Sequence, residues 1–265
     1  MQHQASDPSS PPGSQVVELV NPHGRGPALI LCEHACKDIP DRYDRLGLRD
    51  SDRDSHAAWD PGARAIALTL SQALESPMVA SRVSRLVYDC NRPPDAPDAM
   101  PARSELIDVP GNADLTAAQR AERTAQIYDP FCTTVSEVIA RRQADALPTV
   151  LITIHSFTPV YFGKPRAVEI GILHDDDRRM ADLMLAEAPR LPHRQVVRNA
   201  PYGPQDGVTH SLKLHGLGNG LANVMIEVRN DLVTTTEEEN AMARDLLALI
   251  NPALDALLAG GGDNA

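Results

Sequence analysis

Short apolar runs alternate along the chain with longer segments of helical periodicity. Residues 28–32 form an uninterrupted apolar run that ends at Glu33-His34, and residues 149–154 form a second run that ends at His155. Apolar runs of this length, bounded by polar or turn residues, are typical of strands that are buried on both faces. The same criterion predicts further strands at residues 85–89, 168–173, 195–197 and 221–228.

Four longer segments carry apolar residues at helical spacing and predict helices at residues 51–74, 116–145, 178–188 and 237–258. Strands that alternate with helices of this length predict an α/β fold, in which helices cover both faces of a mostly parallel, mixed central sheet. Residues 1–15 are polar and rich in Ser and Pro, and we expect a disordered tail there. Residues 16–265 are then expected to form one three-layer αβα domain.

Composition narrows the class of protein. The 265 residues suffice for one large domain with a real core, and 42% hydrophobic residues is ordinary for a globular protein. A net charge of −11 argues against a nucleic-acid partner. No apolar run reaches the roughly 18 residues of a membrane span, and the polar first segment lacks a signal-peptide core. Four cysteines are too few for a disulfide scaffold, so a reduced, cytoplasmic protein is expected.

Two histidines directly follow the clearest apolar runs. In parallel α/β sheets the site lies beyond the carboxyl ends of the strands, which is where His34 and His155 are expected. Imidazole is a common zinc ligand, and catalytic zinc usually takes three protein ligands and one open position. Asp60 is our choice for the third ligand, because the following Pro61-Gly62 turn could present it inward. His56 and Glu33 are alternatives for the third ligand. The interpretation without a metal is that His34 and His155 are ordinary hydrogen-bonded histidines at strand ends.

Other polar residues at predicted strand ends suggest catalytic and binding roles. Glu227 stands among apolar neighbours, where an unpaired charge is costly, so a raised pKa could make it a general base. Arg229 shares its strand face and could hold it in place. Arg92 with Asn91 offers a donor pair suited to a substrate carboxylate. Arg85 and His215 are further candidates for substrate contacts.

Three segments, taken together and in this order, resemble the N-formylglutamate amidohydrolase family. They are Ser84-Arg-Leu-Val-Tyr-Asp-Cys-Asn-Arg-Pro-Pro94, His155-Ser-Phe-Thr-Pro159 and Glu227-Val-Arg-Asn-Asp231. The resemblance implies a fold similar to zinc carboxypeptidases, with His155 as second histidine ligand, Glu227 as catalytic glutamate and Asn91-Arg92 as the carboxylate-binding pair. Related enzymes use a His-x-x-Glu motif, but Lys37 stands where its acid would be. That departure is the reason for proposing Asp60.

The resulting hypothesis is hydrolysis of the N-acyl amide of an acidic amino acid, with a small anionic N-formyl amino acid such as N-formylglutamate as the expected substrate. One zinc ion on His34, Asp60 and His155 would activate water, and Arg85 or Arg229 would stabilise the oxyanion. Two alternatives remain: a non-catalytic binding protein for acidic metabolites, and a zinc carboxypeptidase acting on small peptides. No pattern in the sequence specifies an oligomeric state.

Overall fold

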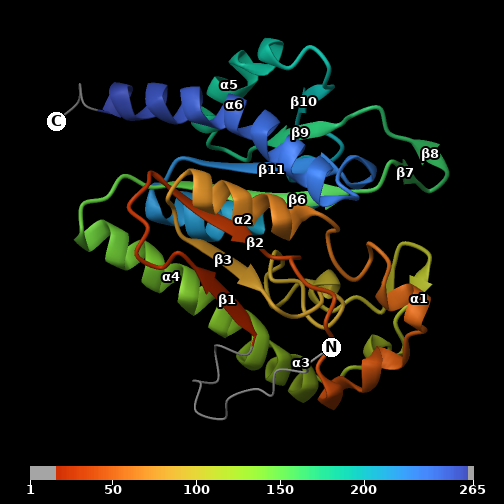
Figure 1. Cartoon of the computed structure of the whole chain (residues 1–265). Helices are drawn as coiled ribbons and strands as arrows, with labels where there is room; N and C mark the ends of the chain where they lie inside the picture. The colour runs from red at the N-terminus through yellow and green to blue at the C-terminus, as the bar shows by residue number, and fades with distance from the viewer. Residues whose placement is uncertain (1–15, 262–265) are drawn as a thin grey trace.

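A seven-stranded mixed sheet forms the centre of the molecule in the computed structural model, which describes residues 16–261 (Figure 1). Its order is β1 (Val17–Val20), β3 (Met78–Ser81), β2 (Ala28–Cys32), β6 (Val150–Phe157), β11 (Asn223–Arg229), β9 (Ile170–Leu173) and β10 (Val196–Arg198). The β1–β3 and β11–β9 pairs are antiparallel, and the other neighbours are parallel. The expected tail at residues 1–15 lies outside the described residues.

Helices cover both faces of this sheet, which confirms the predicted three-layer αβα class (Figure 1). One face carries α2 (Ala63–Ala73), α5 (Arg179–Ala186) and α6 (Thr236–Gly261). The other carries a continuous run of α3 (Ala117–Arg123), the π-helical segment η5 (Thr124–Tyr128) and α4 (Asp129–Ala144). A capping box between Thr116 and Gln119 begins this run, as the Thr-x-x-Gln spacing favours.

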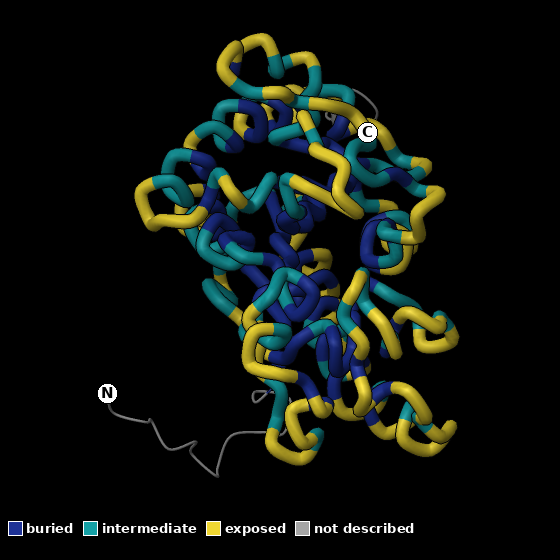
Figure 2. Tube along the Cα trace, turned by 90° about the vertical axis from the view of Figure 1, so that its right-hand side faces the viewer, coloured by how far each residue is buried: buried dark blue, intermediate teal, exposed yellow. Residues whose placement is uncertain are grey.

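Alternation of side chains along the strands divides the core into two parts. Ile152 and Ile226 point to the face covered by α2, α5 and α6, whereas Leu151 and Met225 point to the opposite face. All four are fully buried. Figure 2 shows the buried segments gathered in the interior and the exposed ones at the peripheral loops. The apolar runs of the sequence thus mark the central strands because both of their faces are covered.

Two predicted elements differ from the structure. The predicted strand at residues 85–89 is wrong: the chain there forms buried turns, with Val87 N–H donating to Ser84 O at 2.9 Å. The predicted helix at residues 51–74 is divided into α1 (Asp50–Arg53) and α2. Gly62 separates them because its φ of +81° is left-handed, and the turn before it contains Asp60.

Short elements complete the described chain. The β4–β5 hairpin (Arg103–Ser104 and Ile107–Asp108) lies within a proline-rich segment at residues 93–112. The β7–β8 hairpin (Val160–Tyr161 and Lys164–Pro165) follows β6. The brief helical segments are η2 (Asp41–Gly47), η3 (Pro97–Ala99), η4 (Pro110–Asn112), η6 (Ala188–Arg190), η7 (Pro204–Asp206), η8 (Leu212–Gly216), η9 (Leu217–Asn219) and η10 (Asn230–Leu232). None of the helices in residues 16–261 is long and apolar enough to cross a membrane.

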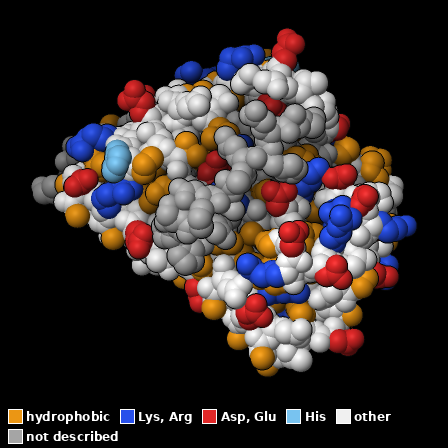
Figure 3. Space-filling view, turned by 60° about the horizontal axis from the view of Figure 1, so that its bottom comes forward, with side chains coloured by type: hydrophobic (Ala, Val, Ile, Leu, Met, Phe, Trp, Pro, Cys, Tyr) orange, Lys and Arg blue, Asp and Glu red, His pale blue; other side chains and the backbone are white. Residues whose placement is uncertain are grey.

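On the face shown in Figure 3, Lys and Arg side chains are interspersed with Asp and Glu. A nucleic-acid interface would instead gather Lys and Arg on one face or along one helix. The mixed distribution on this face accompanies the net charge of −11.

Candidate metal centre and active site

Parallel strands bring the two predicted histidines together at one edge of the sheet. His34 follows β2 by two residues, and His155 lies near the end of the neighbouring strand β6. Glu227 on β11 pairs in register with His155, and both side chains point to the same face as Leu151 and Met225. The central strands therefore place two imidazoles and a carboxyl group side by side.

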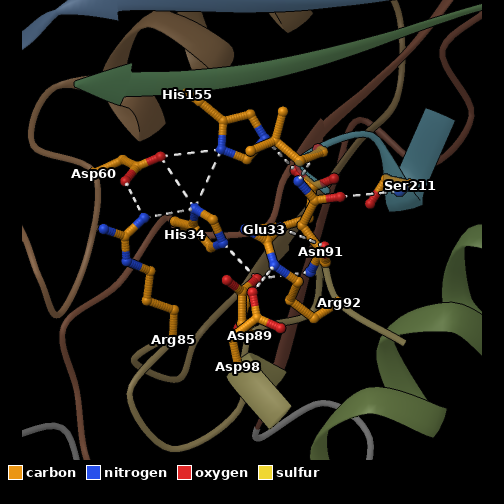
Figure 4. Close-up of polar contacts among 12 residues, drawn as sticks. Glu33, His34, Asp60, Arg85, Asp89, Asn91, Arg92, Asp98, His155 and Ser211 are labelled. Carbon is orange, nitrogen blue, oxygen red and sulfur yellow. Dashed lines mark hydrogen bonds and ion pairs between the residues drawn. The ribbon is translucent and has the colours of Figure 1, made fainter. Parts of the chain in front are cut away.

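Asp60 joins the two histidines and completes a cluster of three buried donors (Figure 4). Its Oδ2 lies 3.2 Å from His34 Nδ1 and 3.0 Å from His155 Nδ1, and the two Nδ1 atoms are 3.2 Å apart. The main chain fixes this placement, since Asp60 N–H donates to His34 O at 2.9 Å and Ser156 N–H donates to Asp60 Oδ2 at 3.3 Å. Three residues from distant parts of the sequence thus converge on one point.

A second carboxylate stands behind each imidazole. His34 Nε2 lies 2.6 Å from Asp89 Oδ1, and His155 Nε2 lies 3.2 Å from Glu33 Oε2. Burial disfavours the charged form of either imidazole, yet Asp89 and Asp60 raise the pKa of His34, and Glu33 with Asp60 raises that of His155. The hydrogen bond to Asp89 favours a proton on His34 Nε2. Glu33 acts on His155 Nε2 through its charge, since their 3.2 Å approach lacks hydrogen-bond geometry, and both Nδ1 atoms face Asp60.

The donor set fits a divalent metal ion. Tetrahedral zinc with bonds of about 2.0–2.1 Å has ligand atoms about 3.3 Å apart, close to the 3.0–3.2 Å separations found here. A carboxylate behind each ligating histidine is the usual outer arrangement at such sites. Three carboxylates contact the two imidazoles, whereas among residues 16–261 one guanidinium, that of Arg85, does so. This excess of negative charge favours a cation.

The two alternative third ligands lie elsewhere. Glu33 is fully buried on the far side of His155 and is not among the three clustered donors. His56 Nε2 lies 2.6 Å from Glu105 Oε2 on the β4–β5 hairpin, again apart from the cluster. Geometry therefore favours Asp60 over both, although that Asp60 binds a metal remains a prediction.

Arg85 is held firmly against the cluster. Its Nη1 lies 3.1 Å from Asp60 Oδ1 and 3.2 Å from His34 Nδ1, while Nε and Nη2 donate to the carbonyls of Ala57 and His56. A guanidinium cannot accept a hydrogen bond, so this contact favours an unprotonated His34 Nδ1, whereas Asp60 favours a protonated one. Arg85 helps to orient Asp60 and His34, and it lines the cavity beside them.

A cavity of about 750 Å³ opens over the three clustered donors. Glu227 lines it, is 5% exposed, and has one carboxyl oxygen, Oε2, without a hydrogen-bond partner in the described chain. Burial raises the pKa of Glu227 to about 7, and Asp60 adds to this, whereas His155, His34 and Arg85 oppose it. A carboxyl group of this kind can both accept and release a proton near neutral pH.

Asn91 and Arg92 also line the cavity, but both already have protein partners. The Asn91 amide donates to Val208 O at 2.6 Å and accepts from Ser211 N–H at 2.9 Å, which holds the 208–211 segment. Arg92 Nε donates to Asp98 Oδ2 at 2.6 Å. A contact between either residue and a substrate remains a prediction.

Two predicted site residues do not line this cavity. Arg229 forms ion pairs with Glu169 and Asp231 at 3.7 and 2.8 Å. His215 lies in η8, is 3% exposed, and burial lowers its pKa to about 4. Arg229 does lie on the same strand face as Glu227, as the sequence predicts, but its side chain points to a neighbouring loop. Substrate contact by His215 is likewise not favoured by its position.

Sequence reasoning missed some residues of the site. Asp89 ends the predicted strand at residues 85–89, and nothing in the sequence pattern pairs it with His34. Arg166 and Tyr202 line the cavity from the β7–β8 hairpin and from the segment after β10, where no periodicity marks them. The proline-rich segment at residues 93–112 lines the cavity through residues such as Asp98 and Arg103.

Comparison with known proteins places these features in a family. Residues 26–234, which span every proposed site residue, match the model of N-formylglutamate amidohydrolase. A gene product of Agrobacterium tumefaciens has a crystal structure with 53% sequence identity and a TM-score of 0.90, covering 92% of this chain and 97% of that one. An N-formylglutamate amidohydrolase from Ralstonia eutropha JMP134 shares the fold, with 18% identity, a TM-score of 0.59, and coverage of 93% and 99%. No curated protein sequence matches the chain significantly.

The family match extends over more than half of the chain and includes both histidines, Asp60 and Glu227. It agrees with the resemblance that the three sequence segments indicated, and the shared fold agrees with the three-layer architecture. The chain belongs to the N-formylglutamate amidohydrolase family.

Proposed function

We propose that this protein hydrolyses the N-acyl amide of an acidic amino acid, with N-formylglutamate as the leading substrate, and that it uses one zinc ion. The observation that carries the proposal is the convergence of His34, Asp60 and His155 donor atoms at 3.0–3.2 Å from one another, beside Glu227 in one cavity. Membership of an amidohydrolase family supports the reaction class over a non-catalytic binding protein.

Zinc held by His34, Asp60 and His155 would lower the pKa of water and polarise a carbonyl group. Glu227 takes a proton from the attacking water and passes it to the leaving nitrogen, a role that suits its raised pKa. The C–N bond of the amide breaks, a C–O bond forms, and the products are formate and the free amino acid.

Arg85 is the better candidate for stabilising the oxyanion, since it lines the cavity beside Asp60 whereas Arg229 lies outside. Arg92 remains the candidate for binding a carboxylate near the reacting amide. We expect Asn91 to act mainly by fixing the 208–211 segment around it.

The size and walls of the cavity favour a small substrate over a peptide. A volume of about 750 Å³ is in the range of small-molecule sites. Residues from the β4–β5 and β7–β8 hairpins line the cavity, so both hairpins bound it. Four free cysteines are compatible with action in the cytoplasm, where thiols stay reduced.

The test combines metal analysis with formate release. Wild-type protein should contain one zinc per chain, and His34→Ala and His155→Ala should lose both metal and activity. His193→Ala is the matched control, because this histidine is exposed and pairs with Asp245 far from the cluster. Glu227→Gln should keep the metal and lose about 10²- to 10⁴-fold in kcat. Near-native turnover by Glu227→Gln, or full zinc content without both histidines, would refute the proposal.

A further inference from the structure

One guanidinium lines the cavity without a carboxylate partner. Arg166 follows the β7–β8 hairpin, and its Cζ lies 4.3 Å from the ring centroid of Tyr161, 4.9 Å from that of Tyr202 and 5.6 Å from that of Phe157. Within residues 16–261, no ion pair involves Arg166. Other arginines of the cavity are paired: Arg85 with Asp60, Arg92 with Asp98 and Arg103 with Asp108.

Arg166 is also held in place. Its main-chain N–H donates to Pro159 O at 2.8 Å, and its carbonyl accepts from Arg229 Nη1 at 3.1 Å. The side chain donates from Nη1 to Thr158 O at 3.3 Å. Three aromatic faces and these bonds restrict the guanidinium while leaving further N–H donors unused, which reduces the entropy lost when an anion binds.

Tyr202 connects this guanidinium with the catalytic end of the cavity. Burial raises the pKa of Tyr202 to about 12, and Glu227 contributes to the rise, whereas Arg166 and Arg85 oppose it. The phenol therefore stays protonated and lies in the fields of both Glu227 and Arg166. Arg166, Tyr202 and Glu227 line one cavity, so Arg166 faces the same space as the proposed general base.

The distance along β6 suggests which part of a substrate reaches Arg166. Phe157 lies two residues beyond His155 on the same face, a rise of about 6.6 Å. In glutamate, four bonds of about 1.5 Å separate the α-nitrogen from the side-chain carboxyl carbon, which spans roughly 5 Å. An amide over the His34–Asp60–His155 cluster can thus extend a glutamate side chain toward Phe157 and its neighbour Arg166.

We propose that Arg166 binds the side-chain carboxylate of the substrate and so selects acidic over neutral N-acyl amino acids. The inference rests on the proposed function and deepens it by assigning a specificity-determining residue. Planar guanidinium and carboxylate groups pair through two parallel hydrogen bonds, which a lysine cannot reproduce. Lys164, on the same hairpin, is exposed and adds charge without this geometry.

The test compares N-formyl-L-glutamate with N-formyl-L-glutamine, which differ in the charge of the side chain. Arg166→Met keeps the apolar contacts with the aromatic rings and removes the charge. It should lower kcat/KM for N-formyl-L-glutamate by roughly 10- to 100-fold. Turnover of N-formyl-L-glutamine should stay within about threefold, which also verifies that the variant folds. Arg166→Lys should recover only part of the loss.

Lys164→Met is the matched control for loss of one positive charge on the hairpin, and it should change the glutamate preference by less than about twofold. An equal loss on both substrates in Arg166→Met, no loss, or the same change in Lys164→Met would overturn the inference. Calorimetric titrations with L-glutamate and with L-glutamine distinguish a failure of this inference from a failure of the proposed function. If the wild type hydrolyses neither substrate, Arg166-dependent preference for L-glutamate would still support the inference, and its absence would refute it.

Discussion

Replacing Asp89 with Asn tests whether the carboxylate behind His34 tunes a metal site. Asp89 Oδ1 lies 2.6 Å from His34 Nε2 and also accepts from Asn91 N–H at 2.8 Å. Asn is nearly the same shape and can keep an oxygen in this position. The substitution therefore removes mainly the negative charge, and His34 should remain in place.

The expected loss of zinc affinity follows from the hydrogen bond between Asp89 and His34. The Asp89 side chain is 11% exposed, so water screens its charge only weakly. A hydrogen bond to a charged group contributes about 1.5–3 kcal/mol, against about 0.5–1.5 kcal/mol for a neutral one. The difference of about 1–1.5 kcal/mol corresponds to roughly a 5- to 12-fold weaker metal affinity. Substitution of outer carboxylates at zinc sites typically costs 10- to 100-fold, so about tenfold is our expectation.

The measurement is a competition titration of zinc between apo-protein and a chromophoric chelator, for wild type and Asp89→Asn. Asp98→Asn is the control: it removes a carboxylate that lines the same cavity but contacts Arg92 instead of a histidine. Equal zinc affinity in wild type and Asp89→Asn would refute the reasoning. A comparable loss in Asp98→Asn would show that the general field, and not the His34 contact, sets the affinity.

Three further predictions concern the framework and the metal. Gly62→Ala should lower both the melting temperature and the zinc content, because an added Cβ would lie 2.4 Å from Val233 Cγ2 at a φ of +81° next to Asp60; thermal melts and metal analysis measure this. Arg142→Met should destabilise the fold by about 2–4 kcal/mol in denaturant titration while activity per folded chain is unchanged, because this buried guanidinium satisfies three main-chain carbonyls far from the cavity. Removal of zinc by a chelator should abolish formate release and lower the melting temperature, and both should return when zinc is added; activity that persists in metal-free protein would contradict a metal-dependent reaction.

The central strands and their polar ends could be predicted because burial on both faces demands uninterrupted apolar residues. That rule located β2, β6 and β11 and thereby the positions of His34, His155 and Glu227. Parallel neighbours then bring residues far apart in sequence to one edge. Asp60 could be anticipated only from its turn, since the Pro61-Gly62 pair indicates a bend without saying where it points.

The remaining parts depend on tertiary contacts that no local pattern encodes. Residues 85–89 resemble a strand because Leu86, Val87 and Tyr88 form a buried apolar run, but the chain there forms turns under the cavity. The β7–β8 hairpin is two exposed residue pairs with no periodicity. Arg166 gains its significance from aromatic rings contributed by two other segments, Phe157 and Tyr202, which meet only in the folded chain.

Strand β11 links the proposed general base with the residue proposed to bind the substrate carboxylate. It carries Glu227 and, two residues later, Arg229, whose guanidinium is bonded to the Arg166 carbonyl. The loop that carries the proposed anchor is thus joined by a hydrogen bond to the same strand that carries the proposed base. We expect this link to make the site sensitive to the length of the substrate side chain: an N-acyl aspartate, one methylene shorter than the glutamate derivative, would reach Arg166 or align its amide, but not both together.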